Sequence, residues 1–167
     1  MNENNLLNND SSIAKKKSNL WKWILGGCGC GCLIIVIALS IASYMGVKFV
    51  KAKIDQYRQE FTSQGFAEVK SQIINVREEV YEKKLFLGQV VKIAADCHTD
   101  IAIVAQSAEV FSNIDGTLYF RGQMLVIQPN AKISGNIDVK AQVVQIFGEV
   151  DGEIKGTYSQ LIDNRKK

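Results

Sequence analysis

The residues of this chain that could do chemistry fall into two short stretches, and the first is Asp-Cys-His-Thr-Asp at 96–100, which holds the only histidine. A cysteine beside a histidine suggests a nucleophile with its base, and carboxylates around a histidine suggest a metal site. Adjacent residues of a strand point to opposite faces, however, so Cys97 and His98 should not meet. Cysteine also packs commonly as a small apolar residue in a core. We therefore predict no catalytic residue, no cofactor and no enzyme.

The second stretch carries three cysteines at alternate positions, Cys28, Cys30 and Cys32. On a helix these side chains point in different directions, so they cannot all face one metal ion. An extended loop could bind a metal through such spacing, but inside hydrocarbon its backbone polar groups would stay unsatisfied. Two other interpretations stay open. The small residues, with Gly27 and Gly31, would allow close helix packing, and cysteines at a membrane edge can be acylated. We predict no metal site here.

A repeat organises the rest of the chain. Five times a small residue followed by glutamine opens a short β-branched run, and the glutamines are 17, 17, 17 and 19 residues apart. A period of this length, repeated without gaps, is typical of a solenoid, in which each unit packs only on its neighbours. The five glutamines are Gln72, Gln89, Gln106, Gln123 and Gln142.

Apolar residues recur at fixed places after each glutamine, with a spacing of two inside each run, which is the strand period. The fold class predicted is all-β, a single-stranded β-helix of about 17 residues per rung with four to five rungs over 66–160. An antiparallel sandwich or barrel is the alternative, but sandwiches seldom keep a residue column in register through five units. The columns are Ile74, Val91, Ala108, Leu125 and Val144; Val76, Ile93, Val110, Ile127 and Ile146; Val80, Cys97, Ile114, Ala131 (or Ile133) and Val150; and Leu85, Ile101, Leu118, Ile137 and Ile154.

A family resemblance lies in residues 125–156, where the pattern apolar-x-Gly-x-apolar recurs and is clearest in Phe-Gly-Glu-Val-Asp-Gly-Glu-Ile at 147–154. This segment resembles the bactofilin family of bacterial polymer-forming cytoskeletal proteins, and the resemblance weakens back to Ser71. It implies a small right-handed β-helix that assembles end to end in the cytoplasm. The first rung departs from the pattern, because six of the eight residues in 77–84 are charged. We expect a frayed or capping turn there.

Before the repeats, residues 24–47 contain no charged side chain, and these 24 residues can cross a ~30 Å hydrocarbon core as a helix. We predict a transmembrane helix over 20–47, with Trp21 and Trp23 at one interface and Tyr44 near the other. A secretory signal is disfavoured because no persuasive cleavage site follows the run. The protein is thus expected in the membrane as a single-pass chain. Lysines flank both ends of the span, so the side on which the repeats lie stays open.

The remaining segments are shorter. Residues 1–19, rich in asparagine, serine and lysine, are predicted to be a disordered tail. Residues 48–65 are predicted to be a helical stalk that ends at Thr-Ser-Gln-Gly, and 161–167 a flexible tail. Along the stalk an apolar stripe with spacing 3, 4, 3, 4 could lie against neighbouring helices or the lipid surface. The stripe consists of Val47, Val50, Ile54, Tyr57 and Phe61.

Two functions fit these elements. The first is a membrane-anchored scaffold that assembles through its β-helix, with copies of itself, membrane lipid and other cell-envelope proteins as partners. Open rung ends favour such strand addition, and the C-terminal end, with Ile146, Val150 and Ile154, is the candidate assembly site. The alternative is a non-polymerising module that presents a rigid β-helix face to a protein or glycan. A formal charge of +3 without a basic stripe excludes nucleic acid as an expected partner.

Overall fold

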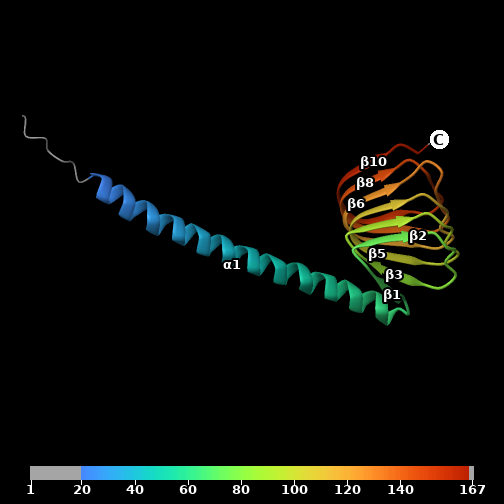
Figure 1. Ribbon diagram of the computed structural model, residues 1–167. Coiled ribbons are helices and arrows are strands. Elements are labelled where there is room, and N and C mark those ends of the chain that lie inside the picture. The colour runs from blue at the N-terminus through green and yellow to red at the C-terminus, as the bar shows by residue number, and fades with distance from the viewer. Residues whose placement is uncertain (1–19, 166–167) are drawn as a thin grey trace, which may run out of the picture. The chain divides into compact units, whose positions relative to one another are not determined.

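The computed structural model describes residues 20–165, and within them the side chains of 35–41 and 48–165. Helix α1 (Leu20–Ser63) is followed by ten strands, β1 to β10 (Figure 1). The chain divides into two compact units, Met1–Lys48 and Phe49–Lys167. The second unit holds the end of α1 together with every strand, and the following description concerns this unit.

No helical segment within the described residues combines the length and the apolar character that a membrane crossing needs. Of the predicted span at 20–47, side chains are described only for 35–41. The tail predicted at 1–19 lies outside the described residues. The membrane span therefore stays a prediction from the sequence.

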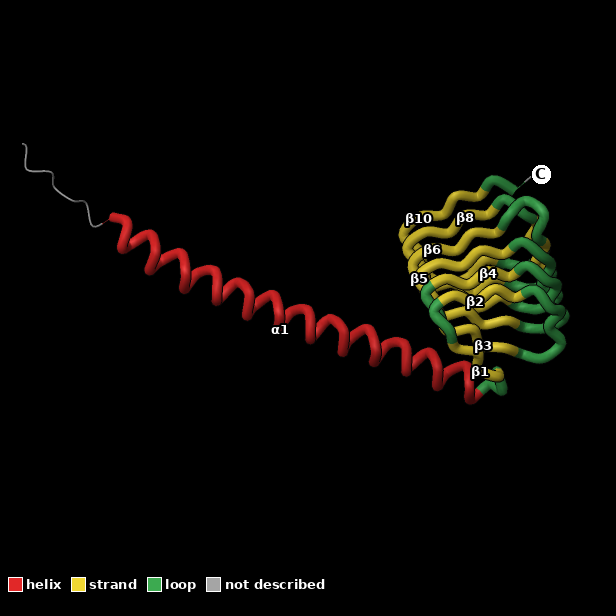
Figure 2. Tube along the Cα trace, viewed as in Figure 1, coloured by secondary structure: helices red, strands yellow, loops and turns green. Residues whose placement is uncertain are grey.

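The strands wind into a solenoid of about six turns, more than the four to five rungs predicted, and every pairing is parallel. Figure 2 shows strands of successive turns side by side. Parallel pairing throughout excludes the antiparallel alternative and confirms the β-helix. The strands are β1 (Ala67–Lys70), β2 (Ile73–Val76), β3 (Lys84–Leu87), β4 (Val90–Ile93), β5 (Ile101–Val110), β6 (Leu118–Ile127), β7 (Lys132–Ile133), β8 (Ile137–Ile146), β9 (Glu149–Val150) and β10 (Ile154–Asp163).

Each turn has three sides, which we number in chain order. Side one contains β1, β3 and the first halves of β5, β6, β8 and β10. Side two contains β2, β4 and the second halves of the same four long strands. Side three is built from single bridges and from the short pair β7 and β9. The predicted glutamine positions fall at the corner between sides one and two.

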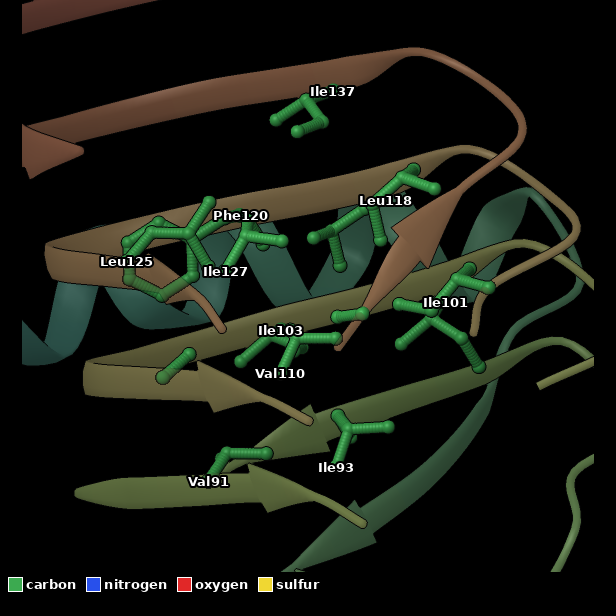
Figure 3. Close-up of a cluster of buried hydrophobic side chains, with 14 of the residues drawn as sticks. Val91, Ile93, Ile101, Ile103, Val110, Leu118, Phe120, Leu125, Ile127 and Ile137 are labelled. Carbon is green, nitrogen blue, oxygen red and sulfur yellow. The ribbon is translucent and has the colours of Figure 1, made fainter. Parts of the chain in front are cut away.

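The predicted apolar columns fill the interior. The column through Ile127 and the column through Leu125 are in register along side two, as expected. Figure 3 shows members of these columns, with Ile103 and Leu118 of side one, gathered in one cluster. This continuous core is what holds the stacked turns together, because no single turn can bury its own apolar face.

The structure settles one position that the predicted columns left open and corrects another. Ile133, not Ala131, continues the side-three column, because it bridges Ile114 and pairs with Val150. The two extra residues of this turn lie before the column position, where the Ala131 amide donates to the Gln128 carbonyl over 3.0 Å.

The correction concerns Leu85, which was predicted as the first residue of the column that continues through Ile101. Lys84, not Leu85, pairs with Ile101, and Leu85 pairs with Ala102. A shift of one residue moves a strand side chain to the other face of the sheet. Leu85 therefore belongs to a small apolar cluster on the outside of side one and not to the solenoid interior.

The end of α1 covers this outer cluster. The helix stops as predicted, with Gly65 at a φ of +85° and with the Phe66 amide donating to the Phe61 carbonyl over 3.2 Å. This is the Schellman arrangement, which brings the residue after the glycine back onto the last helical turn. The rings of Phe61 and Phe66 lie 5.5 Å apart in a T-shaped contact. Phe61 is fully buried and packs with Leu85 and Ala102.

The predicted stalk at 48–65 is thus only partly free. Tyr57 and Phe61 of its apolar stripe pack on the outside of side one. Val50 and Ile54 of the same stripe are 56% and 40% exposed. Of the four stripe members whose side chains are described, two are used within the chain and two are left uncovered.

Strand β10 extends three residues into the segment predicted as a tail at 161–167. Asp163 pairs with Ile146, and the Asn164 amide donates to the Ile146 carbonyl over 2.8 Å. The solenoid therefore ends near residue 163 and not at 160. The reason is that 154–163 keeps the length and backbone pairing of the preceding long strand, although its outward residues are polar.

Candidate functional site

The C-terminal end of the solenoid is an open sheet edge. One side of β10 pairs with β8, and no strand of the described residues lies on its other side. Residues 155–160 are all exposed. An edge strand presents a row of unpaired N–H and C=O groups, which is a template for a further strand.

The apolar core is also incompletely covered at this end. Val150, Ile154 and Leu161 are only partly buried, although they pack against the core. Their counterparts one turn earlier, Ile133 and Ile137 among them, are fully buried. Gly156 occupies the column of Val139, so the last layer lacks a side chain at that place. The C-terminal end surface, defined here as β10 with Val150, thus offers apolar contact together with backbone pairing.

The three predicted assembly residues lie at two depths. Val150 and Ile154 belong to the C-terminal end surface. Ile146 lies one turn inside and is fully buried beside Asp163 of β10. It can contribute to stability of this end, but it is not available to another molecule while β10 is in place.

An ion pair that sequence reasoning missed closes one side of this end. Nε and one terminal nitrogen of Arg165 contact the two carboxylate oxygens of Asp163 at 2.8 and 2.6 Å. The guanidinium also donates to the Val150 carbonyl over 3.4 Å. Bidentate pairs of this kind are well oriented. Side three is therefore partly capped, whereas sides one and two end in the open strand β10.

The N-terminal end differs from the C-terminal end. β1 and β2 are edge strands there, and Ile73 of β2 is 69% exposed. The first core layer is only partly covered. Ile74 and Val80 are exposed by 7% and 3%, whereas Val69, which continues the column of Phe86, is 36% exposed. The charged turn at 77–84 is not frayed, because Val80 exchanges backbone hydrogen bonds with the next turn at 3.0 and 2.8 Å. Apolar side chains are therefore left open at this end as well as at the C-terminal end.

Cys97 and His98 lie on opposite sides of the chain, as predicted. Cys97 is fully buried in the core between Val80 and Ile114. Burial is the main cause that raises the pKa of its thiol to about 12. His98 is outside, where its Nδ1 lies 2.7 Å from Asp115 Oδ2 and its ring stacks on Tyr81 at 4.9 Å. The two side chains do not form a nucleophile and base pair.

Among the residues whose side chains are described, no group of three or more histidine, cysteine, aspartate or glutamate side chains is placed to hold a metal ion. Cys28, Cys30 and Cys32 lie outside those residues. Their packing and acylation therefore stay predictions from the sequence.

The buried thiol makes a first testable prediction. Native protein at pH 8 should show no alkylation of Cys97 by iodoacetamide, because only the thiolate reacts and the side chain is inaccessible. Peptide mapping by mass spectrometry separates Cys97 from the other three cysteines. The same reaction in denaturant is the control and should modify Cys97 fully. Alkylation of Cys97 at similar rates in both conditions would contradict its place in the core.

No family model, no curated protein and no solved structure matches this chain. The class of protein is accordingly defined by the fold itself, a parallel β-helix of about six turns. A β-helix of this kind is consistent with the resemblance of residues 125–156 to bactofilins. The resemblance therefore agrees with the fold alone. A function has to be argued from the surfaces described above.

Proposed function

We propose that this protein is a membrane-anchored structural scaffold whose β-helix associates with further copies of itself through its ends. The observation that carries the proposal is the C-terminal end surface, where an unpaired strand edge adjoins the partly buried Ile154 and Leu161. Backbone pairing would extend the sheet, and burial of these side chains would add apolar contact. No catalytic constellation is needed for this role.

The register of the solenoid indicates how two copies would meet. One column of paired residues begins with Ala67, Lys84 and Ile101 at the N-terminal end. The same column finishes with Ile154 at the C-terminal end. Head-to-tail addition would place Ala67 of the next copy beside Ile154, in the parallel sense used throughout the fold. Two C-terminal ends related by a twofold axis would instead pair β10 with its own copy in antiparallel fashion. The first arrangement grows into a filament, and the second stops at a dimer.

The anchor in this proposal is the uncharged segment at 24–47. Its length suits a bilayer, and the aromatic residues near its ends suit the interfaces. A tethered solenoid would assemble next to the membrane, with lipid and other cell-envelope proteins as neighbours. The scaffold would then give the membrane surface a stiff lattice.

A second function, a non-polymerising module that presents a rigid face to a protein or glycan, is favoured by the capped side three. Assembly of two copies must bury or displace the pair between Arg165 and Asp163. Electron microscopy of Phe49–Lys167 discriminates between the two functions, since the scaffold should form filaments or dimers and the module single particles.

Ile154→Lys should lower the assembly mass by about twofold or more without unfolding the domain, because a lysine at the last layer must be desolvated on contact. Sedimentation velocity of the detergent-solubilised full chain measures the mass, and circular dichroism checks the fold. Phe111→Lys is the matched control, since Phe111 is 41% exposed and lies away from both ends. Ile73→Lys tests the other end and should lower the mass only in head-to-tail assembly. Equal masses for Ile154→Lys and the unsubstituted chain would rule out assembly through this end.

The anchor has its own test. The full-length chain should stay with membranes through an alkaline carbonate wash and should require detergent for release, because a spanning helix is held by the hydrocarbon and not by ionic contacts. The unit Phe49–Lys167 expressed alone should be recovered without detergent. Release of most full-length protein by carbonate would show that residues 24–47 do not span a bilayer.

A further inference from the structure

A groove runs along one corner of the solenoid beside the end of α1. Its volume is about 460 Å³. One wall is formed by α1 residues after Lys48, and the other by the corner between sides one and two, where Gln89, Gln106 and Gln123 stand in consecutive turns. A neighbouring pocket shares Ile54 and Gln89 with it, so the groove continues along the helix. None of the residues used by the C-terminal end surface lines it.

The helix wall of the groove is apolar and uncovered. Phe49, Val50 and Ile54 are exposed by 67%, 56% and 40%. Val50 and Ile54 belong to the stripe whose next members, Tyr57 and Phe61, are packed on the solenoid, and Phe49 lines the same wall. A stripe that is buried at one end and bare at the other indicates that something else covers its bare part.

The charge of the groove is one-sided. Lys53, Arg121 and Lys140 line its main part, and no aspartate or glutamate does. Asp55 and Arg58, of opposite charge, line its continuation along the helix. Arg121 is compensated from outside the groove, since its guanidinium lies 3.0 Å from Asp138 and 3.7 Å from Glu60. The ammonium groups of Lys53 on the helix and Lys140 on the solenoid therefore give the main part of the groove a positive charge.

The two lysines are available to a ligand. Neither Lys53 nor Lys140 forms an ion pair with any residue of the described chain. Lys140 Nζ lies 5.7 Å from the centre of the Tyr57 ring, at the junction of helix and solenoid. Beside it Arg121 is only 3% exposed, and its Nε is buried without a hydrogen-bond partner. That nitrogen is sealed from solvent, so it is not itself a contact for a ligand in the groove.

We propose that this groove binds an anionic phospholipid. The phosphate would sit between Lys53 and Lys140, and the start of an acyl chain would lie along Phe49, Val50 and Ile54. One molecule of this class supplies both the negative charge and the apolar cover that the groove lacks. An acidic peptide would answer the charge but would leave the bare apolar wall without a matching surface.

The groove lies directly after the proposed membrane span in the chain, and this favours a membrane lipid as its ligand. This step rests on the proposed membrane anchor. Phe49 follows the last residue of the uncharged run, Val47, by two positions. Lys53 follows Val47 by six positions, so it would lie close to the headgroup layer of a bilayer that residues 24–47 span. Anionic headgroups attract lysines that lie near the membrane surface. A lipid shared by the helix and the solenoid would fix the angle at which the scaffold meets the membrane.

Lysine labelling of the full-length chain in neutral detergent tests the proposal. Dioctanoyl phosphatidylglycerol should slow acetylation of Lys53 and Lys140 at least fivefold, as read by peptide mass spectrometry. Lys51 on the helix and Lys155 on the solenoid are controls in the same sample and should react at unchanged rates. Dioctanoyl phosphatidylcholine and inorganic phosphate, at equal concentration, should protect neither lysine of the groove.

Paired variants give a second readout. Dioctanoyl phosphatidylglycerol should raise the melting temperature of the unsubstituted chain. Lys53→Gln with Lys140→Gln should remove most of that rise, whereas Lys51→Gln with Lys155→Gln should keep it. Because the lipid is supplied in dispersed form, this result does not depend on whether residues 24–47 span a bilayer, so failure of the anchor and failure of the groove are told apart.

Four results would overturn the proposal. Equal protection by phosphatidylcholine would mean apolar association without headgroup recognition, and protection by phosphate alone would mean a simple anion site. Protection by a polyglutamate peptide as strong as that by the lipid would favour an acidic protein segment. Protection that rises with protein concentration in the absence of lipid would mean that a second copy fills the groove.

Discussion

An aspartate in place of Ile127 is expected to unfold the solenoid. Ile127 is fully buried, and it stands in the column between Val110 and Ile146, so the new carboxylate would have apolar neighbours above and below. Burying an unpaired charge is among the few single changes that cost more than about 4 kcal/mol. Each turn is stabilised by its neighbours, so damage in a central turn affects the whole stack.

Thermal melting followed by far-ultraviolet circular dichroism measures this effect. Met124→Asp is the matched control, because Met124 lies on the same strand, β6, and is 37% exposed. The control should melt within a few degrees of the unsubstituted protein, while Ile127→Asp should show no cooperative melt. A cooperative, unshifted melt for Ile127→Asp would disprove the register of side two.

Phe61→Ala is expected to detach the end of α1 from the solenoid. The ring is fully buried against Phe66 and Tyr119, at centroid distances of 5.5 Å for both. Removal of a buried phenylalanine ring typically costs about 3–5 kcal/mol. The loss falls on the junction of helix and solenoid, because the interior columns do not include Phe61. Local opening rather than global unfolding should result.

Hydrogen exchange across the last turns of α1 reports this opening and should quicken by about a hundredfold or more, given the free energy lost. Phe49→Ala is the control on the same helix, since Phe49 is 67% exposed and should leave exchange unchanged. Exchange in β5 and β6 should also stay slow. If Phe61→Ala left the helix end protected, the packing described for the outer cluster would be incorrect.

The period of the repeats determined most of the fold. In a parallel solenoid a residue meets its equivalent one turn later, so a 17-residue spacing in the sequence becomes a column in space. This is why Ile74, Val91 and Leu125 could be placed in the core from their distance to a glutamine. It is also why Cys97 and His98 could be assigned to opposite faces from their adjacency alone.

The period was insufficient where a turn changed length or a second surface was apolar. The 19-residue turn offered both Ala131 and Ile133 for one column, and only the bridge to Ile114 chose between them. Leu85 was misplaced because apolar character marks any buried position, inside the solenoid or under the helix. The end of the solenoid was predicted three residues too early. The outward residues of the last strand are polar, and only its backbone pairing with β8 identifies it.

Only the tertiary structure decided how the helix end meets the solenoid and which residues form a surface together. The groove joins Lys53 to Lys140, which are far apart in the sequence and follow no common period. The cap formed by Arg165 depends on the positions of Val150, in the last strand of side three, and Asp163, at the end of β10. Contacts within the solenoid repeat, and a repeat can be read along the chain. Contacts between the helix and the solenoid occur once, so no pattern in the sequence encodes them, and they follow from the packing of particular side chains.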